Sequence, residues 1–271
     1  MADRAYAEVI GDPVAHSKSP LIHGFWLDAL GIDAEYRRRA VPPAELGAYI
    51  AAAGADPAWR GCNVTLPHKV AVMELVADPG GVRDGIGAMN TVLRGEDGAL
   101  FGTNTDAAGF YAPIADVDLA GAPVVVAGAG GAARAVLFAL ARAGVGHVTL
   151  MNRSPLKAAG LLARFGLKGD VVPLGSPLPP ASLLVNASSL GMAGQPTLDI
   201  DLSPLPEDAI VYDIVYAPLE TPLLAQARAR ELDTVDGLEM LIGQAALAFE
   251  LFFGAAPPRD RDGELRERLT S

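Results

Sequence analysis

"VVVAGAGGAARAVLFAL", residues 124–140, is the stretch that decides the fold. Its first residues are apolar without polar alternation, which predicts a parallel strand covered on both faces. The turn after them has the spacing G-x-G-x-x-A, with Gly128, Gly130 and Ala133, and the apolar pattern that follows predicts a helix. A strand, a glycine turn and a helix in this order predict the dinucleotide-binding unit of a doubly wound, Rossmann-type sheet.

The glycine turn itself is expected to bind a dinucleotide. Gly128 permits a tight turn, Gly130 lets a phosphate approach the backbone, and the small Ala133 lets helix and strand pack closely. The pyrophosphate would then lie at the N-terminus of the helix, where free amides and the dipole favour negative charge. The expected contacts of this turn are Gly128, Ala129, Gly130, Gly131 and Ala132.

"HVTLMNRSP", residues 147–155, predicts which dinucleotide is used. At the end of the second strand, NAD-dependent folds carry an acid that binds the free ribose 2′-hydroxyl. Here Asn152, Arg153 and Ser154 offer donors instead, and Lys157 lies one helical turn further on. Arginine suits bidentate contact with a phosphate, so the predicted cofactor is NADP(H) and not NAD(H). The alternative is that Arg153 is a solvated surface charge.

Strand-like and helix-like segments alternate along the chain, which predicts an α/β protein. We expect two domains separated by a cleft. Residues 1–106, completed by 238–271, would form an α/β substrate-binding catalytic domain, and residues 107–237 a Rossmann NADP-binding domain. Locally we expect a helix over 19–31, with Ser19 as N-cap and Gly31 at its end, and a hairpin over 90–102.

Composition narrows the class of partner. The chain has 271 residues and a formal charge of −11, which argues against nucleic acid and against an anionic membrane surface. The N-terminus has no apolar run typical of a signal peptide, and the apolar stretch 238–254 is interrupted by Gln244 and Glu250, so we expect a cytoplasmic protein. The single cysteine, Cys62, is expected to be a core residue. The His, Cys and carboxylate spacing predicts no metal site.

Residues 61–72, "GCNVTLPHKVAV", indicate a cleft wall. Alternation places Cys62, Val64 and Leu66 on one face and two polar residues, Asn63 and Thr65, on the other. Lys69 is expected in the first turn of a helix begun by Pro67. The helix dipole disfavours a cation there and would lower the lysine pKa towards that of a general acid or base. The alternative is an ordinary surface lysine.

Two further segments carry candidate polar groups. In "GTNTDAAGF", residues 102–110, Asn104 and Asp106 are expected on one face of an extended segment. If Asp106 met Lys69 across the cleft, the two would form a proton-transfer pair, although spacing alone does not bring them together. In "GDPVAHSKSP", residues 11–20, Ser17 and Ser19 are hydroxyl donors that hold a carboxylate or cap the local turn.

These segments together resemble the shikimate dehydrogenase family over nearly the whole chain. The resemblance also rests on "GAMNTV", "GAGGAAR", "NASSLGM", "YDIVYAPLETPLL" and "GLEMLIGQA". It implies NADPH-dependent, reversible reduction of 3-dehydroshikimate to shikimate, in the pathway to chorismate and aromatic amino acids. It implies Lys69 and Asp106 as the catalytic pair and Ser17 and Ser19, with Tyr216, at the substrate carboxylate. It further implies ring-hydroxyl contacts from Asn63, Thr65, Asn90 and Gln244, and a nicotinamide end lined by Ile214 and Gly237.

Three alternatives are weighed against this resemblance. A quinate/shikimate dehydrogenase that prefers NAD would carry an acid where Asn152 and Arg153 stand. A methylenetetrahydrofolate dehydrogenase shares the two-domain plan, but the paired serines and the "NTD" segment do not fit it. A sensor that kept the fold and lost the chemistry should have lost Lys69 or Asp106. The expected partner is therefore a small molecule, and the chain is expected as a monomer or a homodimer.

Overall fold

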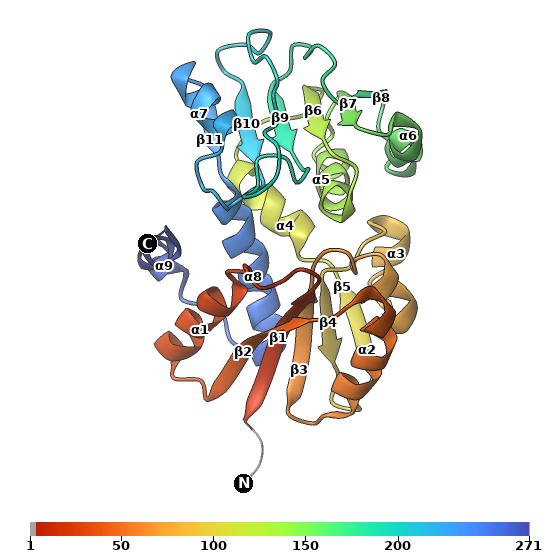
Figure 1. The fold of residues 1–271 in the computed structure, drawn as a ribbon, viewed down its shortest axis with the longest axis vertical. Helices are drawn as coiled ribbons and strands as arrows, with labels where there is room; N and C mark the ends of the chain where they lie inside the picture. Colours follow the sequence, from red (N-terminus) through yellow and green to blue (C-terminus); the bar gives the residue numbers. More distant parts are fainter. Residues whose placement is uncertain (1–3, 271) are drawn as a thin grey trace. The chain divides into compact units, whose positions relative to one another are not determined.

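The chain divides into two compact units, each built on its own β-sheet (Figure 1). The structure is a computed structural model that describes residues 4–270, apart from the side chain of Lys157. The first unit contains the described residues up to Thr105 and those from Ile242 onward. The second unit is Asp106–Leu241.

The first unit has a five-stranded mixed sheet in the order β2-β1-β3-β4-β5. β1 pairs in parallel with β2 and β3, whereas β3, β4 and β5 pair antiparallel. The predicted hairpin is confirmed, because β4 and β5 are joined by a turn in which Gly95 N donates to Ala99 O. The strands are β1 Ala5–Gly11, β2 Ala34–Ala40, β3 Trp59–Val64, β4 Thr91–Arg94 and β5 Leu100–Thr103.

Helices pack on both faces of this sheet. On one face Leu46 and Ile50 of α2 join a core with Ile10 of β1 and Val64 of β3. On the other face the aromatic rings of α1 and α8 meet, and Trp26 lies edge-on to Phe249. The helical elements are α1 Ser19–Leu30, η1 Pro43–Glu45, α2 Leu46–Ala55, η2 Ala71–Leu75, α3 Val82–Gly85, α8 Gly237–Phe253, η4 Arg259–Arg261 and α9 Asp262–Thr270.

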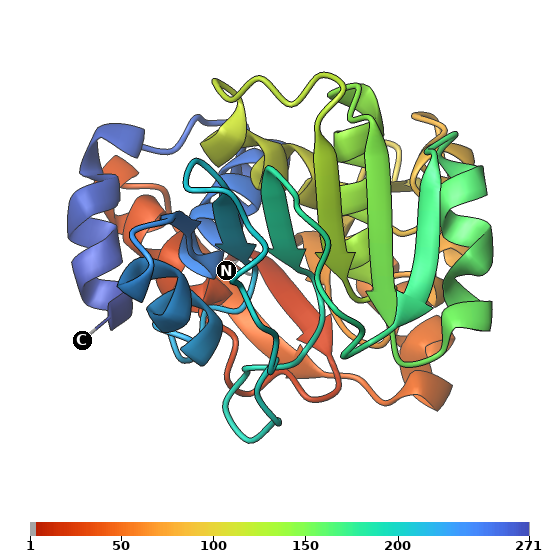
Figure 2. The ribbon, with the colours of Figure 1, turned by 90° about the horizontal axis from the view of Figure 1, so that it is seen from above.

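The second unit has a six-stranded sheet in the order β11-β10-β9-β6-β7-β8, all of it parallel. Read from β8, the strands follow the chain order 3-2-1-4-5-6, which confirms the predicted doubly wound fold. β6, β7 and β8 lie side by side in Figure 2, with α6 against β7 and β8. The strands are β6 Pro123–Ala127, β7 His147–Asn152, β8 Gly169–Pro173, β9 Leu183–Asn186, β10 Ile210–Asp213 and β11 Asp233–Val235.

Both faces of the second sheet are covered, which explains the uniformly apolar strand over 123–127. Val124 and Val126 pack into one core with the helices α4 and α5, while Val125 and Ala127 pack into a second core on the opposite face. The remaining helical elements are α4 Asp106–Tyr111, η3 Ala112–Ile114, α5 Gly131–Arg142, α6 Pro155–Arg164 and α7 Pro222–Ala229.

Three local predictions are wrong. Ser19 is the first residue of α1 and not its N-cap, which is Lys18. No α-helix begins at Pro67: a turn leads into the 3₁₀ helix η2, because the Lys69 carbonyl accepts from Met89 N at 2.7 Å instead of from a following turn. Leu66 is exposed, because β3 ends at Val64 and the strand alternation ends with it.

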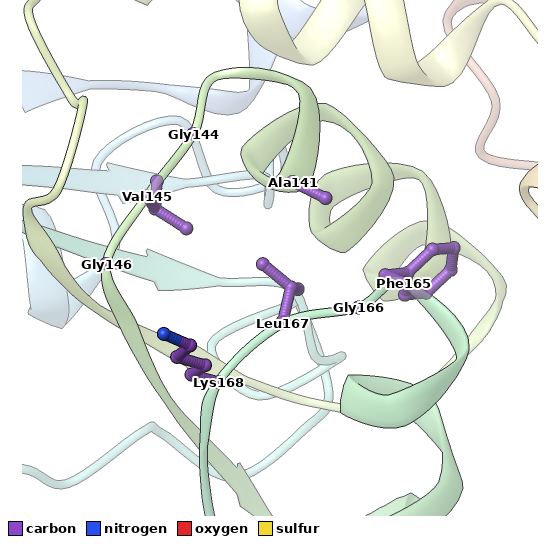
Figure 3. A pocket seen from close by; sticks show the side chains of 8 residues that line it. All are labelled: Ala141, Gly144, Val145, Gly146, Phe165, Gly166, Leu167 and Lys168. Atoms are coloured by element: carbon purple, nitrogen blue, oxygen red, sulfur yellow. The ribbon is translucent and has the colours of Figure 1, made fainter.

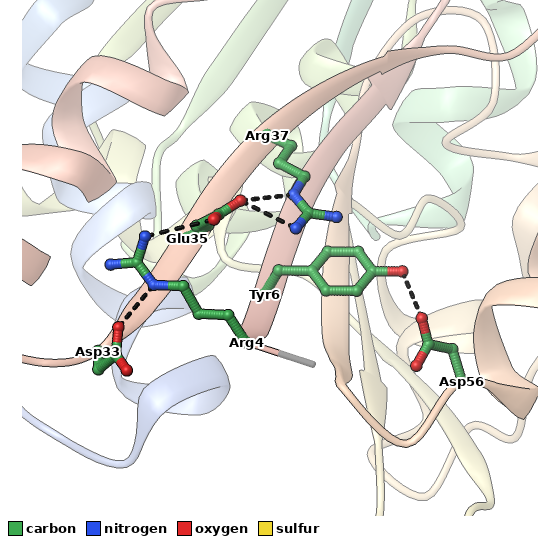
Figure 4. Close-up of polar contacts among 6 residues, drawn as sticks. All are labelled: Arg4, Tyr6, Asp33, Glu35, Arg37 and Asp56. Carbon is green, nitrogen blue, oxygen red and sulfur yellow. Dashed lines mark hydrogen bonds and ion pairs between the residues drawn. The ribbon is translucent and has the colours of Figure 1, made fainter. Parts of the chain in front are cut away.

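The outer strand β2 of the first sheet carries a network of charges (Figure 4). Arg4 pairs with Asp33 at 2.7 Å and with Glu35 at 3.3 Å, and Glu35 also pairs with Arg37 at 2.9 Å. The Arg37 guanidinium lies 4.0 Å from the centre of the Tyr6 ring. Exposed pairs of this kind add little stability, but charges on an outer strand oppose pairing with another sheet edge.

A buried carboxylate, Asp213, ties together β9, β10 and α7. It accepts hydrogen bonds from Asn186 Nδ2 at 2.9 Å, Val215 N at 3.0 Å and Thr221 Oγ1 at 2.7 Å. Burial raises the pKa of Asp213, while these three hydrogen bonds oppose the rise. Thr221 also caps α7 by accepting from Leu224 N.

Thr221→Val should lower the free energy of unfolding by about 2 kcal/mol, measured by urea denaturation. The change removes a helix cap and leaves Asp213 with one hydrogen bond fewer in a buried site. Thr221→Ser is the control, because it keeps the hydroxyl and should recover most of the loss. Equal stability of the valine and serine variants would show that the hydroxyl contributes nothing.

Candidate active site

The glycine turn between β6 and α5 has the geometry that a dinucleotide phosphate requires. Gly128 has φ +110°, and a Cβ on it would lie 2.7 Å from the Ala187 carbonyl oxygen, so no other residue fits without displacing backbone. Gly130 is the N-cap of the twelve-residue α5, and a Cβ built on it would meet open space. Beyond Gly128, the turn therefore leads into the N-terminus of α5 at an open surface, an arrangement that favours the binding of an anion.

The carboxyl end of β7 places the predicted 2′-phosphate residues next to this turn. Gly128 N donates to Met151 O at 2.8 Å, so the turn is bonded directly to the residue before Asn152. Asn152 Nδ2 donates to Ser154 O at 3.0 Å, which holds the segment around Arg153, whose side chain is exposed. Lys157 is in α6, but its side chain lies outside the described part of the structure.

The two residues expected at the nicotinamide end, Ile214 and Gly237, are brought together. A Cβ on Gly237 would lie 2.4 Å from Ile214 O and 2.5 Å from Val215 O. The N-terminus of α8 therefore packs on the backbone that follows β10, and only glycine allows this approach. Tyr216 comes two residues after Ile214 and is half-buried, which raises the pKa of its hydroxyl.

The second unit also has a hollow of about 320 Å³ whose lining includes no residue of the glycine turn (Figure 3). It lies between the loop that precedes β7 and the loop that precedes β8, lined by Gly144–Gly146, Phe165–Lys168 and Ala141. In a parallel sheet these loops are at the opposite edge from the glycine turn, where ligands of doubly wound folds bind. The hollow therefore does not belong to the dinucleotide site.

In the first unit, five of the predicted substrate residues are buried polar side chains. They are Ser17, Ser19, Asn63, Asn90 and Gln244, none more than 8% exposed. Buried polar groups are normally hydrogen-bonded, and these side chains form several of their hydrogen bonds with one another. Thr65 lies just beyond the end of β3, where its backbone N donates to Ile10 O and its side chain is half-buried.

Asn63 is held by partners from the strands β2 and β4 and from Asn90, the residue before β4. Its Oδ1 accepts from the Tyr36 hydroxyl of β2 at 2.6 Å. Its Nδ2 donates to Thr91 Oγ1 at 3.1 Å and to Asn90 O at 3.3 Å. These contacts fix both the position and the orientation of the Asn63 amide.

Asn90 continues the chain of hydrogen bonds to α8. Its Oδ1 accepts from Thr91 Oγ1 at 3.0 Å and from Thr105 N at 2.8 Å. Its Nδ2 donates to Thr105 Oγ1 at 2.9 Å and to Gln244 Oε1 at 3.3 Å. Residues distant in sequence thus converge on one polar wall.

The serine pair lies at the start of α1. Ser17 Oγ donates to Ser19 Oγ at 3.2 Å and accepts from Ser19 N at 3.3 Å, so Ser17 also caps its own turn. Arg38 Nε donates to Ser17 O at 3.0 Å, and Lys18 Nζ donates to Leu269 O of α9. The serine turn is therefore fixed by β2 and by the C-terminal helix.

Lys69 and Asp106 are each connected to Asn90 through a residue next in sequence to Asn90 or to Asp106. The Lys69 carbonyl accepts from Met89 N, the residue before Asn90, and the lysine is half-buried. Asp106 is buried and follows Thr105, which bonds to Asn90. The predicted extended segment is wrong here, because Asp106 begins α4 while Asn104 precedes the helix.

Three linking residues, Tyr36, Thr91 and Thr105, are not singled out by the sequence. Thr91 and Thr105 each follow an asparagine, in "MNTV" and "TNTD", and that repetition is a usable signal. The described residues contain no group of three His, Cys, Asp or Glu side chains placed to hold a metal ion. Nor does any helix within residues 4–270 have both the length and the apolarity needed to cross a membrane.

Comparison with known proteins gives one consistent family. Residues 9–92 match the shikimate dehydrogenase substrate binding domain, and residues 237–261 match the shikimate 5′-dehydrogenase C-terminal domain. The chain is 73% identical to a shikimate dehydrogenase (NADP(+)) of Sphingopyxis alaskensis, over 98% of this chain and 97% of that protein.

Solved structures agree with the sequence comparison. The shikimate 5-dehydrogenase of Thermus thermophilus, in complex with NADP(H) and shikimate, is 39% identical with a TM-score of 0.85 and coverage of 98% and 99%. A quinate dehydrogenase of Corynebacterium glutamicum in complex with NAD is 31% identical, also with a TM-score of 0.85 and coverage of 98% and 99%. The same fold thus serves two substrates and two cofactors, so individual residues must decide between them.

Proposed function

We propose, from the premise that this chain belongs to the shikimate dehydrogenase family, that Lys69 and Asp106 transfer the proton of its reaction. The chain is an NADP-dependent oxidoreductase, and its reaction is the reversible reduction of 3-dehydroshikimate to shikimate in aromatic biosynthesis. What is proposed is the assignment of its residues to the parts of that reaction.

The substrate-binding proposal rests on the buried polar chain in the first unit. Shikimate carries one carboxylate and several ring hydroxyls, so it needs hydroxyl and amide partners in fixed places. Ser17 and Ser19, with Tyr216, bind the carboxylate. The ring hydroxyls are bound by Asn63, Thr65, Asn90 and Gln244. The single observation that carries this assignment is that the chain of hydrogen bonds from Asn63 through Asn90 to Gln244 joins residues more than 150 positions apart in sequence.

The cofactor proposal rests on the glycine turn and the segment after β7. NADPH, when bound, supplies the hydride. Arg153, with Asn152, Ser154 and Lys157, binds the 2′-phosphate, and the turn 128–132 binds the pyrophosphate. Ile214 and Gly237 line the nicotinamide end, where α8 approaches the backbone after β10 too closely for any side chain at position 237.

Lys69 gives its proton to the carbonyl oxygen as that oxygen gains charge during reduction. In the oxidation of shikimate the same group receives the hydroxyl proton. Asp106 completes the acid–base pair, and its burial at the start of α4 keeps its carboxylate out of bulk solvent.

The proposal extends to the roles of the two units, the cellular location and the partners. The first unit is the substrate-binding catalytic domain and the second is the NADP-binding domain. The protein acts in the cytoplasm on a small molecule, without nucleic acid or membrane, as a monomer or a homodimer. The formal charge of −11 and the single, buried Cys62 support this assignment.

The test is kcat/KM for shikimate and for quinate, each measured with NADP⁺ and with NAD⁺. We expect shikimate with NADP⁺ to be preferred strongly over the other three combinations. Comparable rates with quinate or NAD⁺ would contradict the assignment of Arg153 and of the polar chain.

A further inference from the structure

We infer that Tyr36 is a positioning residue for substrate binding, which links the carboxylate-binding serines to the hydroxyl-binding Asn63. The inference rests on the proposed roles of Ser17, Ser19 and Asn63. It adds a residue outside the motifs of the active site, on the outer strand β2.

The hydroxyl of Tyr36 joins two groups that come from different parts of the chain. The Tyr36 hydroxyl donates to Asn63 Oδ1 of β3 at 2.6 Å, and Ser19, at the start of α1, interacts with the same hydroxyl. Ser17 Oγ donates to Ser19 Oγ at 3.2 Å, so the serine pair, Tyr36 and Asn63 form one connected set of polar groups. In such a set each hydrogen bond polarises its neighbours and strengthens them.

Donation from Tyr36 fixes the orientation of the Asn63 amide and leaves a lone pair of Oδ1 for a ligand hydroxyl, because both hydrogens of Nδ2 are already donated. With Oδ1 accepting from Tyr36, the amide is oriented so that Nδ2 points to Thr91 and to the Asn90 carbonyl. A tyrosine hydroxyl can impose this orientation only while it is protonated. Burial raises the pKa of Tyr36 well above its ordinary value, so the donor is present at every working pH.

The ring of Tyr36 is itself held firmly. It stacks on His23 of α1 with centroids 3.9 Å apart and planes 3° from parallel. Neither nitrogen of the fully buried His23 has a hydrogen-bond partner among the described residues, and burial lowers its pKa to about 3. His23 therefore acts as a neutral aromatic plate that fixes where the Tyr36 hydroxyl lies.

The chemical consequence is a fixed spacing between the serine turn and the Asn63 amide. A ligand with a carboxylate and ring hydroxyls must satisfy both ends at once. Loss of the bridging hydroxyl removes the hydrogen bond that holds Asn63 Oδ1 and the contact of Ser19 with it. Substrate binding should weaken, while hydride and proton transfer in the bound complex should proceed nearly as before.

Tyr36→Phe tests this, because phenylalanine keeps the ring stack and removes only the hydroxyl. We expect KM for shikimate to rise about tenfold, with kcat within about twofold and KM for NADP⁺ unchanged. Tyr49→Phe is the matched control: Tyr49 is another tyrosine of this unit, partly buried, and its hydroxyl donates to Glu8 at 2.9 Å, outside the polar chain. That variant should keep the wild-type KM for shikimate.

A double-mutant cycle shows whether Tyr36 acts through Asn63. Asn63→Ala should raise KM for shikimate, and Tyr36→Phe added to it should cost little more, because the two groups work as one. If Asn63→Ala leaves KM unchanged, the proposed substrate site itself is wrong, and this inference with it. If Asn63→Ala raises KM but Tyr36→Phe does not, or if the two effects add fully, only the role of Tyr36 is overturned.

Discussion

Lys69→Ala should lower kcat for shikimate oxidation by about a hundredfold or more, with KM for shikimate changed far less. The lysine is proposed to move the proton at the reacting oxygen, an interaction realised in the transition state and not in ground-state binding. Its backbone is fixed by the hydrogen bond from Met89 N, so the alanine variant should keep the local fold. Steady-state kinetics at saturating NADP⁺ measure both constants.

Two companion variants separate proton transfer from charge. Lys69→Arg keeps a positive charge but holds its proton too tightly to exchange it, so kcat should stay low. Lys168→Ala removes an exposed lysine of the second unit, at the hollow on the far edge of its sheet, and should change neither constant. Near-normal turnover in Lys69→Ala, or full rescue by arginine, would remove Lys69 from the proton-transfer step.

The second unit was largely predictable because burial on both faces leaves a strong sequence pattern. The strand β6 is uniformly apolar, the middle of β7 is buried, and the glycine turn follows β6 directly. The strands β8 and β11 were not predicted. They are five and three residues long, lie at the two edges of the sheet and are partly exposed, so they lack an apolar run.

The first unit shows where local pattern fails. The stretch after Pro67 has helical composition, yet the Lys69 carbonyl is taken by Met89 N from across the unit, and no α-helix forms there. Tertiary contacts of this kind have no local signature. Lys69 is therefore not in the first turn of an α-helix, and its proposed role rests on family membership and on the hydrogen bond that its carbonyl accepts from Met89 N, beside Asn90.

The candidate site also contains residues that the sequence predicts and one that it does not. Ser17, Asn63 and Asn90 lie in motifs that the sequence displays, so they could be named in advance. Tyr36 could not, because its partner Asn63 is 27 positions away and is reached only when β2 and β3 both pair with β1. A polar residue becomes part of a site through its neighbours, and strand order is a property of the whole sheet.

Arg153→Ala should lower kcat/KM for NADP⁺ by about 10- to 100-fold, the worth of a charge-assisted contact with a phosphate, and leave kcat/KM for NAD⁺ within about threefold. The side chain is exposed at the end of β7, beside a turn bonded to the same strand, so its removal should not disturb the fold.

Arg142→Ala is the matched control for this prediction, because Arg142 is an exposed arginine at the far end of α5 and has the same effect on net charge. The expected result is a change in cofactor preference and not a general loss of activity, since NAD⁺ lacks the phosphate that Arg153 is proposed to bind.

Raising the salt concentration should weaken NADP⁺ binding in the wild type more than in Arg153→Ala, because the screened interaction is absent from the variant. An equal fall with both cofactors would mean that Arg153 supports the turn and not the phosphate. An unchanged kcat/KM with both cofactors would mean that Arg153 is a solvated surface charge. NADP preference would then have to come from Asn152, Ser154 and Lys157.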